Sequence, residues 1–149
     1  MFVMGGRKVN FGYSLKQYLP QPRGKTAWKL FPGSVRKIAV DPRGAPWVLS
    51  ARRTVLSWNG NSWTNHKVRA TKIAVGGDNS VFIIRRGSIL KFEPNSNNWM
   101  KIPGQAKEIA VNGSGKPLII DRGNGVKWPE ENCKVKVPLE KRERKEVQN

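Results

Sequence analysis

Short apolar segments recur along the chain, and clusters of Gly, Pro, Asn and Asp separate them. The clusters read DPRGAP, GGDNS and NGSGKP, a composition that is typical of tight turns between strands. No segment sustains the hydrophobic period of an amphipathic helix. The pattern therefore predicts an all-β protein built from short antiparallel strands.

The tripeptide Ile-Ala-Val occurs three times, at residues 38–40, 73–75 and 109–111, with spacings of 35 and 36 residues. When the chain is aligned on this tripeptide, large aromatic residues on either side of it also fall into register. Because aromatic residues that recur at equivalent places are typical of a packed core, we interpret them as core rather than as a stacking platform for sugars or bases. The expected core residues are Trp28, Trp47, Trp58, Trp63, Phe82, Phe92, Trp99 and Trp128.

The repeats span residues 26–60, 61–96 and 97–128. Each has room for four strands. The first begins at the first Trp, the second is Ile-Ala-Val, the third is an apolar run such as PWVL, and the fourth is a run such as VLSW. Four-stranded antiparallel units at this period predict the blades of a β-propeller. Closed propellers typically have about four to eight blades, so three repeats predict a partial propeller that a second copy or another protein completes.

The basic N-terminal segment, residues 1–25, contains five basic and no acidic residues. Its sequence FVMGGRKVNF is similar to VFIIRRGSILKF of the second repeat. This similarity predicts the third and fourth strands of an additional partial blade, with Arg7 and Lys8 in the hairpin between them. An organellar targeting peptide is the alternative interpretation of the segment.

The repeat columns resemble the tectonin repeat, in which a Trp, Pro-Gly, Ile-Ala-Val, an aromatic-led strand and a closing aromatic residue follow one another. The resemblance covers residues 26–128 and implies a non-enzymatic propeller. Members of the family include lectins that bind glycans or bacterial lipopolysaccharide, and intracellular modules of membrane-trafficking proteins. The chain departs from the family pattern in its three clear repeats, where closed members have five or six, and in its strongly basic composition.

The formal net charge is +18, from 28 basic and 10 acidic residues. The positive charges repel one another, which destabilises the folded protein, and an anionic partner would neutralise this repulsion. Residues 26–128 carry +12 of this charge, from 17 basic and 5 acidic residues. The C-terminal tail, residues 129–149, carries only +1, and its end PLEKRERKEVQN favours a short helix.

The basic residues of the repeats concentrate in two kinds of loop. The predicted hairpin between the third and fourth strands reads ARRT, RRGS and DRGN in the three repeats, and the loop between the first and second strands is also basic. Because neighbouring strands run in opposite directions, both kinds of loop are expected on one rim of the propeller. The expected anion-binding residues of this rim are Arg36, Lys37, Arg52, Arg53, Arg69, Lys72, Arg85, Arg86, Lys107 and Arg122.

Arg predominates in these hairpins, and its planar fork matches phosphate or carboxylate groups. We therefore favour an anion-binding rim over charged loops that only keep the protein soluble. The sequence has neither a Gly-rich phosphate loop nor an RNA-recognition motif, so we expect the rim to read charge and shape rather than base sequence. The loops of the opposite rim are rich in Asn and Gly, which favours turn formation, with sugar binding as the alternative.

The cysteine and histidine content narrows the classes of function. A single cysteine, Cys133, excludes a disulfide framework and favours a reducing, cytoplasmic or cytoskeletal compartment. With one histidine, His66, neither a Cys/His metal site nor a cofactor is expected. Because His66 has no evident catalytic partner and Asp41, Asp78 and Asp121 fit turns, no enzymatic activity is expected. No apolar run approaches the length of a membrane span.

Two hypotheses for the function follow from these features. The leading one is a non-enzymatic scaffold module, an intracellular partial propeller that docks in a larger assembly with its basic rim against RNA or an acidic protein surface. The alternative is a lectin-like tectonin that binds glycans or the head groups of phospholipid or lipopolysaccharide.

Overall fold

The computed structural model describes residues 2–9, 12–20, 22–24, 26–121, 123 and 125–127. The predicted all-β class is confirmed, and all paired strands are antiparallel. Among the described residues, the only helical segment is a short 3₁₀ turn at Pro22–Gly24. The strands are β1 (Phe2–Val9), β2 (Gly12–Pro20), β3 (Thr26–Val40), β4 (Pro46–Ser50), β5 (Thr54–Trp58), β6 (Trp63–Arg69), β7 (Lys72–Val75), β8 (Val81–Arg85), β9 (Ser88–Glu93), β10 (Asn98–Gln105), β11 (Glu108–Val111), β12 (Pro117–Ile120) and β13 (Val126–Lys127).

The strands form three sheets, in the orders β1-β2-β3-β4-β5-β6, β10-β9-β8-β7 and β11-β12-β13. The six-stranded sheet bends within the long strand β3, whose residues 26–31 pair with β2 and whose residues 37–40 pair with β4. Val35 lies at the bend and pairs with both strands. This sheet therefore has an N-terminal half, made of β1, β2 and the first part of β3, and a C-terminal half, made of the rest of β3 and β4 to β6.

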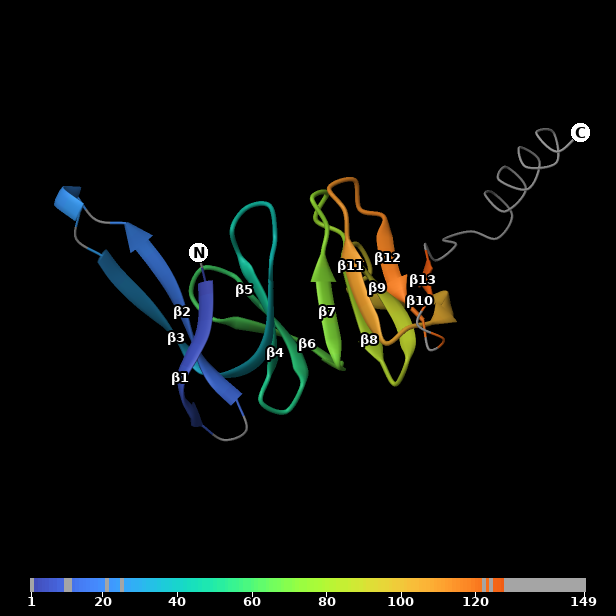
Figure 1. Cartoon of the computed structure of the whole chain (residues 1–149), viewed down its shortest axis with the longest axis horizontal. Coiled ribbons are helices and arrows are strands. Elements are labelled where there is room, and N and C mark those ends of the chain that lie inside the picture. Colours follow the sequence, from blue (N-terminus) through green and yellow to red (C-terminus); the bar gives the residue numbers. More distant parts are fainter. Residues whose placement is uncertain are drawn as a thin grey trace, which may run out of the picture.

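The two halves, the four-stranded sheet and the three-stranded sheet stack as four layers; in Figure 1 the two halves lie to the left, and the other two sheets overlap in the view to their right. Apolar side chains fill the space between adjacent layers, because a sheet buries its apolar face against a neighbour. The first cluster contains Leu15, Phe31, Val35 and Val48, the second contains Trp47, Leu49, Val55, Val68, Ala70, Val81 and Ile83, and the third contains Ala74, Phe82, Ile84, Ile89, Ile102, Ala106, Ile109 and Ile119.

Strands β4 and β8 lie between two of these clusters and are buried on both faces. In β4, Val48 packs toward the N-terminal half, whereas Trp47 and Leu49 pack toward the four-stranded sheet. In β8, Ile83 and Phe82 alternate in the same way between the second and third clusters. Burial on both faces explains why these strands are continuous apolar runs in the sequence instead of alternating patterns.

The grouping of strands differs from the predicted four-stranded unit at one strand. The first strand of the second repeat, β6, pairs with β5 of the first repeat, and β10 likewise pairs with β9 of the second repeat. The C-terminal half and the four-stranded sheet therefore each contain the second, third and fourth strands of one repeat and the first strand of the next. The reason is that the short connections at residues 70–71 and 106–107 cross to the next layer instead of turning back as hairpins.

The N-terminal segment differs from its predicted hairpin. Strand β1 runs through Arg7 and Lys8 without folding back on itself, and it pairs with β2 at Phe2–Gly5 and at Val9, with an irregularity between them. Arg7 and Lys8 thus lie in a strand and not in a turn. Pairing with the longer strand β2 satisfies more backbone N–H and C=O groups than a hairpin within ten residues could, which accounts for the difference.

Some predicted features lie outside the described residues. They are Arg122, Trp128 and the tail at 129–149 with its short helix. The targeting-peptide interpretation of residues 1–25 stays a prediction. Across the residues that are described, no helix is both long enough and apolar enough to cross a membrane.

Candidate anion-binding rim

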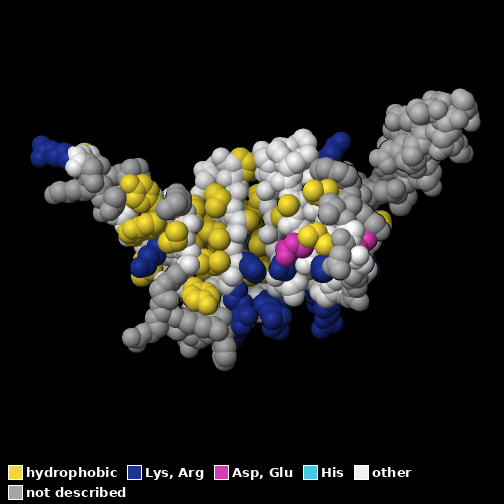
Figure 2. All heavy atoms as spheres, viewed as in Figure 1, with side chains coloured by type: hydrophobic (Ala, Val, Ile, Leu, Met, Phe, Trp, Pro, Cys, Tyr) yellow, Lys and Arg dark blue, Asp and Glu magenta, His cyan; other side chains and the backbone are white. Residues whose placement is uncertain are grey.

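The loops that were expected to be basic lie at one end of the stacked sheets. The β4–β5 and β8–β9 hairpins and the β6–β7 and β10–β11 connections share this end because neighbouring strands run in opposite directions. Figure 2 shows Lys and Arg side chains gathered along the lower edge of the molecule, where these hairpins lie in Figure 1. We call this end the basic rim, and its described residues are Arg36, Lys37, Arg52, Arg53, Arg69, Lys72, Arg85, Arg86 and Lys107.

The β4–β5 hairpin exposes two adjacent arginines on a well-ordered turn. The Ser50 hydroxyl accepts hydrogen bonds from the backbone N–H groups of Arg52 (3.3 Å) and Thr54 (3.1 Å), and the Arg53 N–H donates to the Ser50 carbonyl (2.8 Å). Arg53 has φ 68°, in the left-handed region that favours glycine. The turn thus holds Arg53 in a backbone conformation that a long side chain rarely adopts.

The β8–β9 hairpin, at the corresponding place in the next repeat, carries a second pair of arginines on a shorter turn. Arg85 pairs with Ser88, so Arg86 and Gly87 are the two central turn residues, with φ of 51° and 84°. Positive φ at both central residues defines a type I′ turn, for which Asn-Gly is the preferred sequence. Arg86 therefore stands where Asn is usual, and its side chain is exposed.

The connection between β6 and β7 joins the two hairpins. The Arg69 Nε donates to the Arg52 carbonyl (2.9 Å), and the Ala70 N–H donates to the Arg53 carbonyl (2.9 Å). On the other side, the N–H and the hydroxyl of Thr71 both donate to the Ile84 carbonyl (2.7 and 3.1 Å). These bonds fix the two hairpins relative to each other although they belong to different sheets.

A hollow of about 320 Å³ lies between the hairpins at this point. Its lining consists of Arg53, Arg69, Ala70, Thr71, Arg85 and Arg86. The side chains of Arg53, Arg85 and Arg86 make no ion pair or hydrogen bond with another described residue. Four guanidinium groups therefore surround one hollow without a carboxylate to neutralise them.

The other predicted rim residues lie outside this hollow. Arg36 donates from Nε to the Ala51 carbonyl (2.9 Å), on the opposite side of the first hairpin. Lys72 forms an ion pair of 2.8 Å with Glu108, so both of these charges are already compensated. The remaining rim residues, Lys37, Arg52 and Lys107, are exposed and do not line the hollow.

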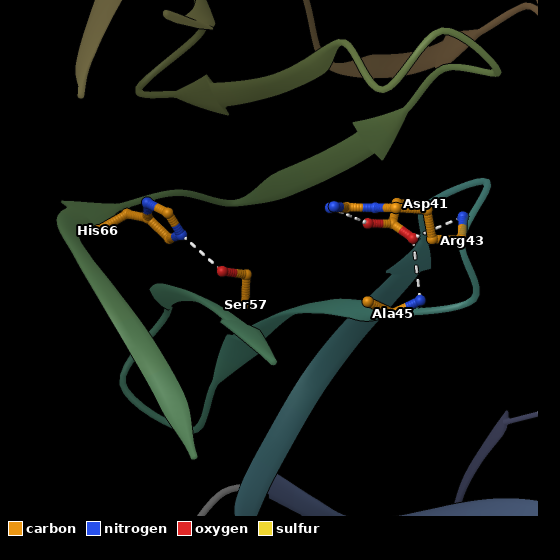
Figure 3. Close-up of polar contacts among 5 residues, drawn as sticks. All are labelled: Asp41, Arg43, Ala45, Ser57 and His66. Atoms are coloured by element: carbon orange, nitrogen blue, oxygen red, sulfur yellow. Dashed lines mark hydrogen bonds and ion pairs between the residues drawn. The ribbon is translucent and has the colours of Figure 1, made fainter. Parts of the chain in front are cut away.

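The loops at the opposite end use their polar side chains to hold their own turns. The Asp41 carboxylate accepts from the N–H groups of Arg43 and Ala45 (2.9 Å each) and from the Arg43 guanidinium (3.0 Å), as Figure 3 shows. Asn112 caps its loop in the same manner. At Asp78, the hydrogen bond from the Ser80 hydroxyl, and next that from its N–H, hold the pKa of the carboxyl below its ordinary value. These contacts are those of turn formation.

His66 lies between two layers and not in a reactive site. Its ring stacks on Trp47, with centroids 4.6 Å apart, and its Nε2 is 2.8 Å from the Ser57 hydroxyl (Figure 3). The Nδ1 atom is buried and has no hydrogen-bond partner among the described residues. Burial lowers the pKa of His66, because the charged form would lose its hydration. In the described part of the chain, no three His, Cys, Asp or Glu side chains cluster as metal ligands.

The predicted core aromatics occupy two kinds of environment. Trp47 and Phe82 are buried within the clusters, while Trp58, Trp63, Phe92 and Trp99 are partly buried against them. Trp28 differs, because its side chain is 44% exposed. It lies on the outer face of the N-terminal half, where no described layer packs on it, and its ring meets that of Tyr18 edge-on (5.4 Å).

The sequence pattern predicted that the hairpin arginines share one end of the molecule, where the described ones do lie, but it did not indicate the hollow. Thr71 was not among the predicted residues, although its repeat column also holds Arg36 and Lys107. That column is the signal that could have identified it. The hollow itself depends on the pairing of β6 with β5, which the repeat pattern does not specify.

No known protein-family model matches this chain, and no curated protein sequence matches it either.

Proposed function

We propose that the stacked layers are consecutive blades of a partial propeller of the tectonin type. The 35-residue period and the recurrence of the same columns between successive layers support this assignment. So does the pairing of β6 and β10 with the preceding repeat, because each of these strands then continues through a short connection into the next layer. The propeller is completed by a second copy or by another protein, since one outer face remains open at the N-terminal half.

The function proposed for this module is non-enzymatic binding within a larger intracellular assembly. Its basic rim docks against an anionic surface, either RNA or an acidic protein. The observation that carries the proposal is the group of four guanidinium groups around one hollow, with no carboxylate beside them among the described residues. Uncompensated charge of this density favours a polyanionic partner over simple solvation.

The chemistry of the rim suits recognition by charge and shape. Guanidinium forks pair with both phosphate and carboxylate oxygens, and they keep their charge at every physiological pH. The described part of the rim presents no aromatic side chain on which a base could stack. We therefore expect no discrimination between different bases. Binding is therefore expected to depend on the density of negative charge.

The lectin-like alternative rests on the tectonin resemblance and on the Asn-rich loops. The polar side chains of those loops form hydrogen bonds within the loops. Asn59, for example, accepts hydrogen bonds from the backbone N–H groups of Asn61 and Ser62 (2.9 Å each). The Trp63 indole N–H likewise donates to the Pro32 carbonyl (2.8 Å). Fewer groups are left for sugar hydroxyls, which is why this function ranks second.

Salt dependence separates the two functions. The full-length protein is titrated with fluorescent polyuridylate RNA, with polyglutamate and with a neutral oligosaccharide at about 50 and 200 mM salt. Rim binding predicts tight binding to a polyanion at low salt and a steep loss of affinity at high salt, because counterions are released. Salt-independent binding of the neutral oligosaccharide, without binding to either polyanion, would replace this proposal with the lectin function.

A further inference from the structure

We propose that the hollow of the basic rim is a binding site for a small group that carries two phosphates, such as a pyrophosphate or a bisphosphorylated head group. This inference rests on the proposed function and narrows it from a polyanionic surface to a defined ligand class. It goes beyond the rim as a whole because the hollow has a shape, a fixed set of donors and a limited volume.

One donor of the hollow, Arg69, and the backbone that carries the other three are held in place before any ligand arrives. Arg69 is anchored through its Nε to the Arg52 carbonyl (2.9 Å), which leaves its terminal nitrogens free to bind. The neighbouring N–H of Ala70 and both donors of Thr71 are used in bonds to the two hairpins. The ligand is therefore met by guanidinium groups alone, on a backbone that the same bonds make rigid.

The charge of the hollow fits two phosphates. Four arginines line it, and a phosphate monoester carries about −1.5 to −2 charges at neutral pH, so two such groups balance the four. No acid lines the hollow among the described residues, and Glu108 of β11 is paired with Lys72 at 2.8 Å. A guanidinium fork also binds two oxygens of one phosphate at once, which favours this group over an isolated single charge.

The walls of the hollow argue for a compact ligand. Its volume of about 320 Å³ lies at the lower end of small-molecule sites. Apart from the arginine stems, Ala70 and Thr71 complete the lining, so neither an aromatic surface nor an extended apolar wall is present among the described residues. A nucleobase would find no stacking partner there, and the phosphates are the part of a ligand that the site recognises.

The backbone conformation of two lining residues adds an independent observation. Arg53 and Arg86 both have positive φ, at 68° and 51°, at turn positions that Gly or Asn fills more favourably. A long side chain in such a conformation is a local strain, and strain of this kind concentrates at functional sites. Both strained residues belong to the same hollow, although they come from separate hairpins.

The test is isothermal titration calorimetry of the full-length protein with inorganic pyrophosphate at low salt. We expect saturable binding that weakens at least tenfold in Arg85→Ser and in Arg69→Ser. The control Lys116→Ser removes an equal charge from the opposite end and is expected to change the affinity less than twofold. Thermal melting verifies each fold, and Arg85→Ser keeps the test valid if loss of the Arg69 anchor disturbs the hairpin.

The outcomes distinguish this inference from the proposed function. No pyrophosphate binding, with retained binding to polyuridylate or polyglutamate, would overturn the site and leave the rim function standing. Loss of binding to all of these probes would overturn both. Citrate that binds as tightly as pyrophosphate, or equal weakening by Lys116→Ser, would reduce the hollow to unspecific charge and contradict the phosphate class.

The source of the phosphates is identified by two further arms. Soluble bisphosphorylated inositol is compared with the same head group presented on lipid vesicles, and vesicles without the phosphates serve as the blank. Binding to the vesicles that exceeds binding to the soluble head group supports the site and assigns a lipid source. Binding to the soluble form alone supports the site and assigns a free small molecule.

Discussion

His66 occupies a position that the other repeats give to an apolar side chain. The equivalent residues are Phe31 and Ile102. The geometry around it is also conserved within the chain: Phe31 meets Trp58 edge-on at 5.0 Å, and His66 meets Phe92 edge-on at 5.0 Å. The imidazole thus serves as an aromatic core side chain, and the cost of burying it depends on its staying neutral.

This burial predicts a pH dependence of stability. The pKa of His66 is lowered in the folded protein, so above its unfolded pKa of about 6.5 the ring is neutral in both states and the full stability is present. As the pH falls below that value, the unfolded chain takes up a proton that the folded chain resists. The free energy of unfolding is therefore expected to fall by up to about 1.4 kcal/mol per pH unit, until the pH passes the folded pKa.

The measurement is urea denaturation at several pH values between 5 and 8, a range above the ordinary pKa values of Asp and Glu. The matched control is His66→Phe, which restores the side chain of the first repeat and is expected to remove the slope. An unchanged slope in the variant would show that another group is responsible.

Arg86 permits a test in which stability and binding move in opposite directions. Arg86→Asn creates the Asn-Gly pair that a type I′ turn prefers, so the melting temperature is expected to rise, with a gain of up to about 1 kcal/mol. Binding to a polyanion is expected to weaken, because one guanidinium of the hollow is lost. Equal or tighter binding by the variant in an anisotropy titration would count against a role for this arginine.

At the scale of the element, the third strands of the first two repeats, β4 and β8, pack against the layers on both sides of them. Trp47 in β4 is 8% exposed, stacks on His66 of the same sheet and meets Phe92 of the four-stranded sheet edge-on at 5.7 Å. Trp47→Ala removes these contacts and leaves a cavity between two layers. The expected loss is about 3–5 kcal/mol of unfolding free energy, measured by urea denaturation. A loss below 1 kcal/mol, roughly that of a surface change, would contradict the placement of Trp47 in the core.

The elements themselves were predictable, whereas their pairing was not. Hydrophobic pattern and turn residues are local signals, and they predicted the apolar strands β4 and β8 and the Ile-Ala-Val strands. The partner of β6 is decided by the crossing of residues 70–71 to the next layer, which no local pattern encodes. For the same reason, the sequence indicated basic hairpins but not the hollow that the β6–β7 connection creates between them.

At the scale of the whole molecule, the N-terminal half leaves an apolar face uncovered. Leu30 is 62% exposed and Trp28 is 44% exposed, and strand pairing places Tyr18 beside Trp28 on the same face. Equivalent faces inside the stack are covered by the next layer. Because exposed apolar patches of this kind often mark sites of association, we propose that a second copy or another protein covers this face.

We therefore predict that the purified chain self-associates unless its natural partner is present. Sedimentation velocity at micromolar concentration is expected to show dimers or larger species. Leu30→Lys places a charge in the open face and is expected to shift the distribution toward monomer, while Lys101→Glu on an exposed strand position serves as the control. A well-folded wild-type monomer would contradict the incomplete propeller.

The central claim is that the arrangement of the arginines, and not net charge, makes the rim a binding surface. Two variants test it directly. The rim variant replaces Arg52, Arg53, Arg85 and Arg86 with Ser, and the matched variant replaces four basic residues elsewhere, namely Lys16, Arg23, Lys101 and Lys116. Both lose the same formal charge, and surface changes of this kind usually cost little stability.

The decisive measurement is the affinity of each variant for polyuridylate or polyglutamate as a function of salt. The account predicts that both variants melt like the wild type, that the rim variant loses at least tenfold in affinity together with most of the salt slope, and that the matched variant keeps both. Equal weakening of the two variants, or full-strength binding by the rim variant, would contradict this account. Binding would then not depend on the position of the rim arginines.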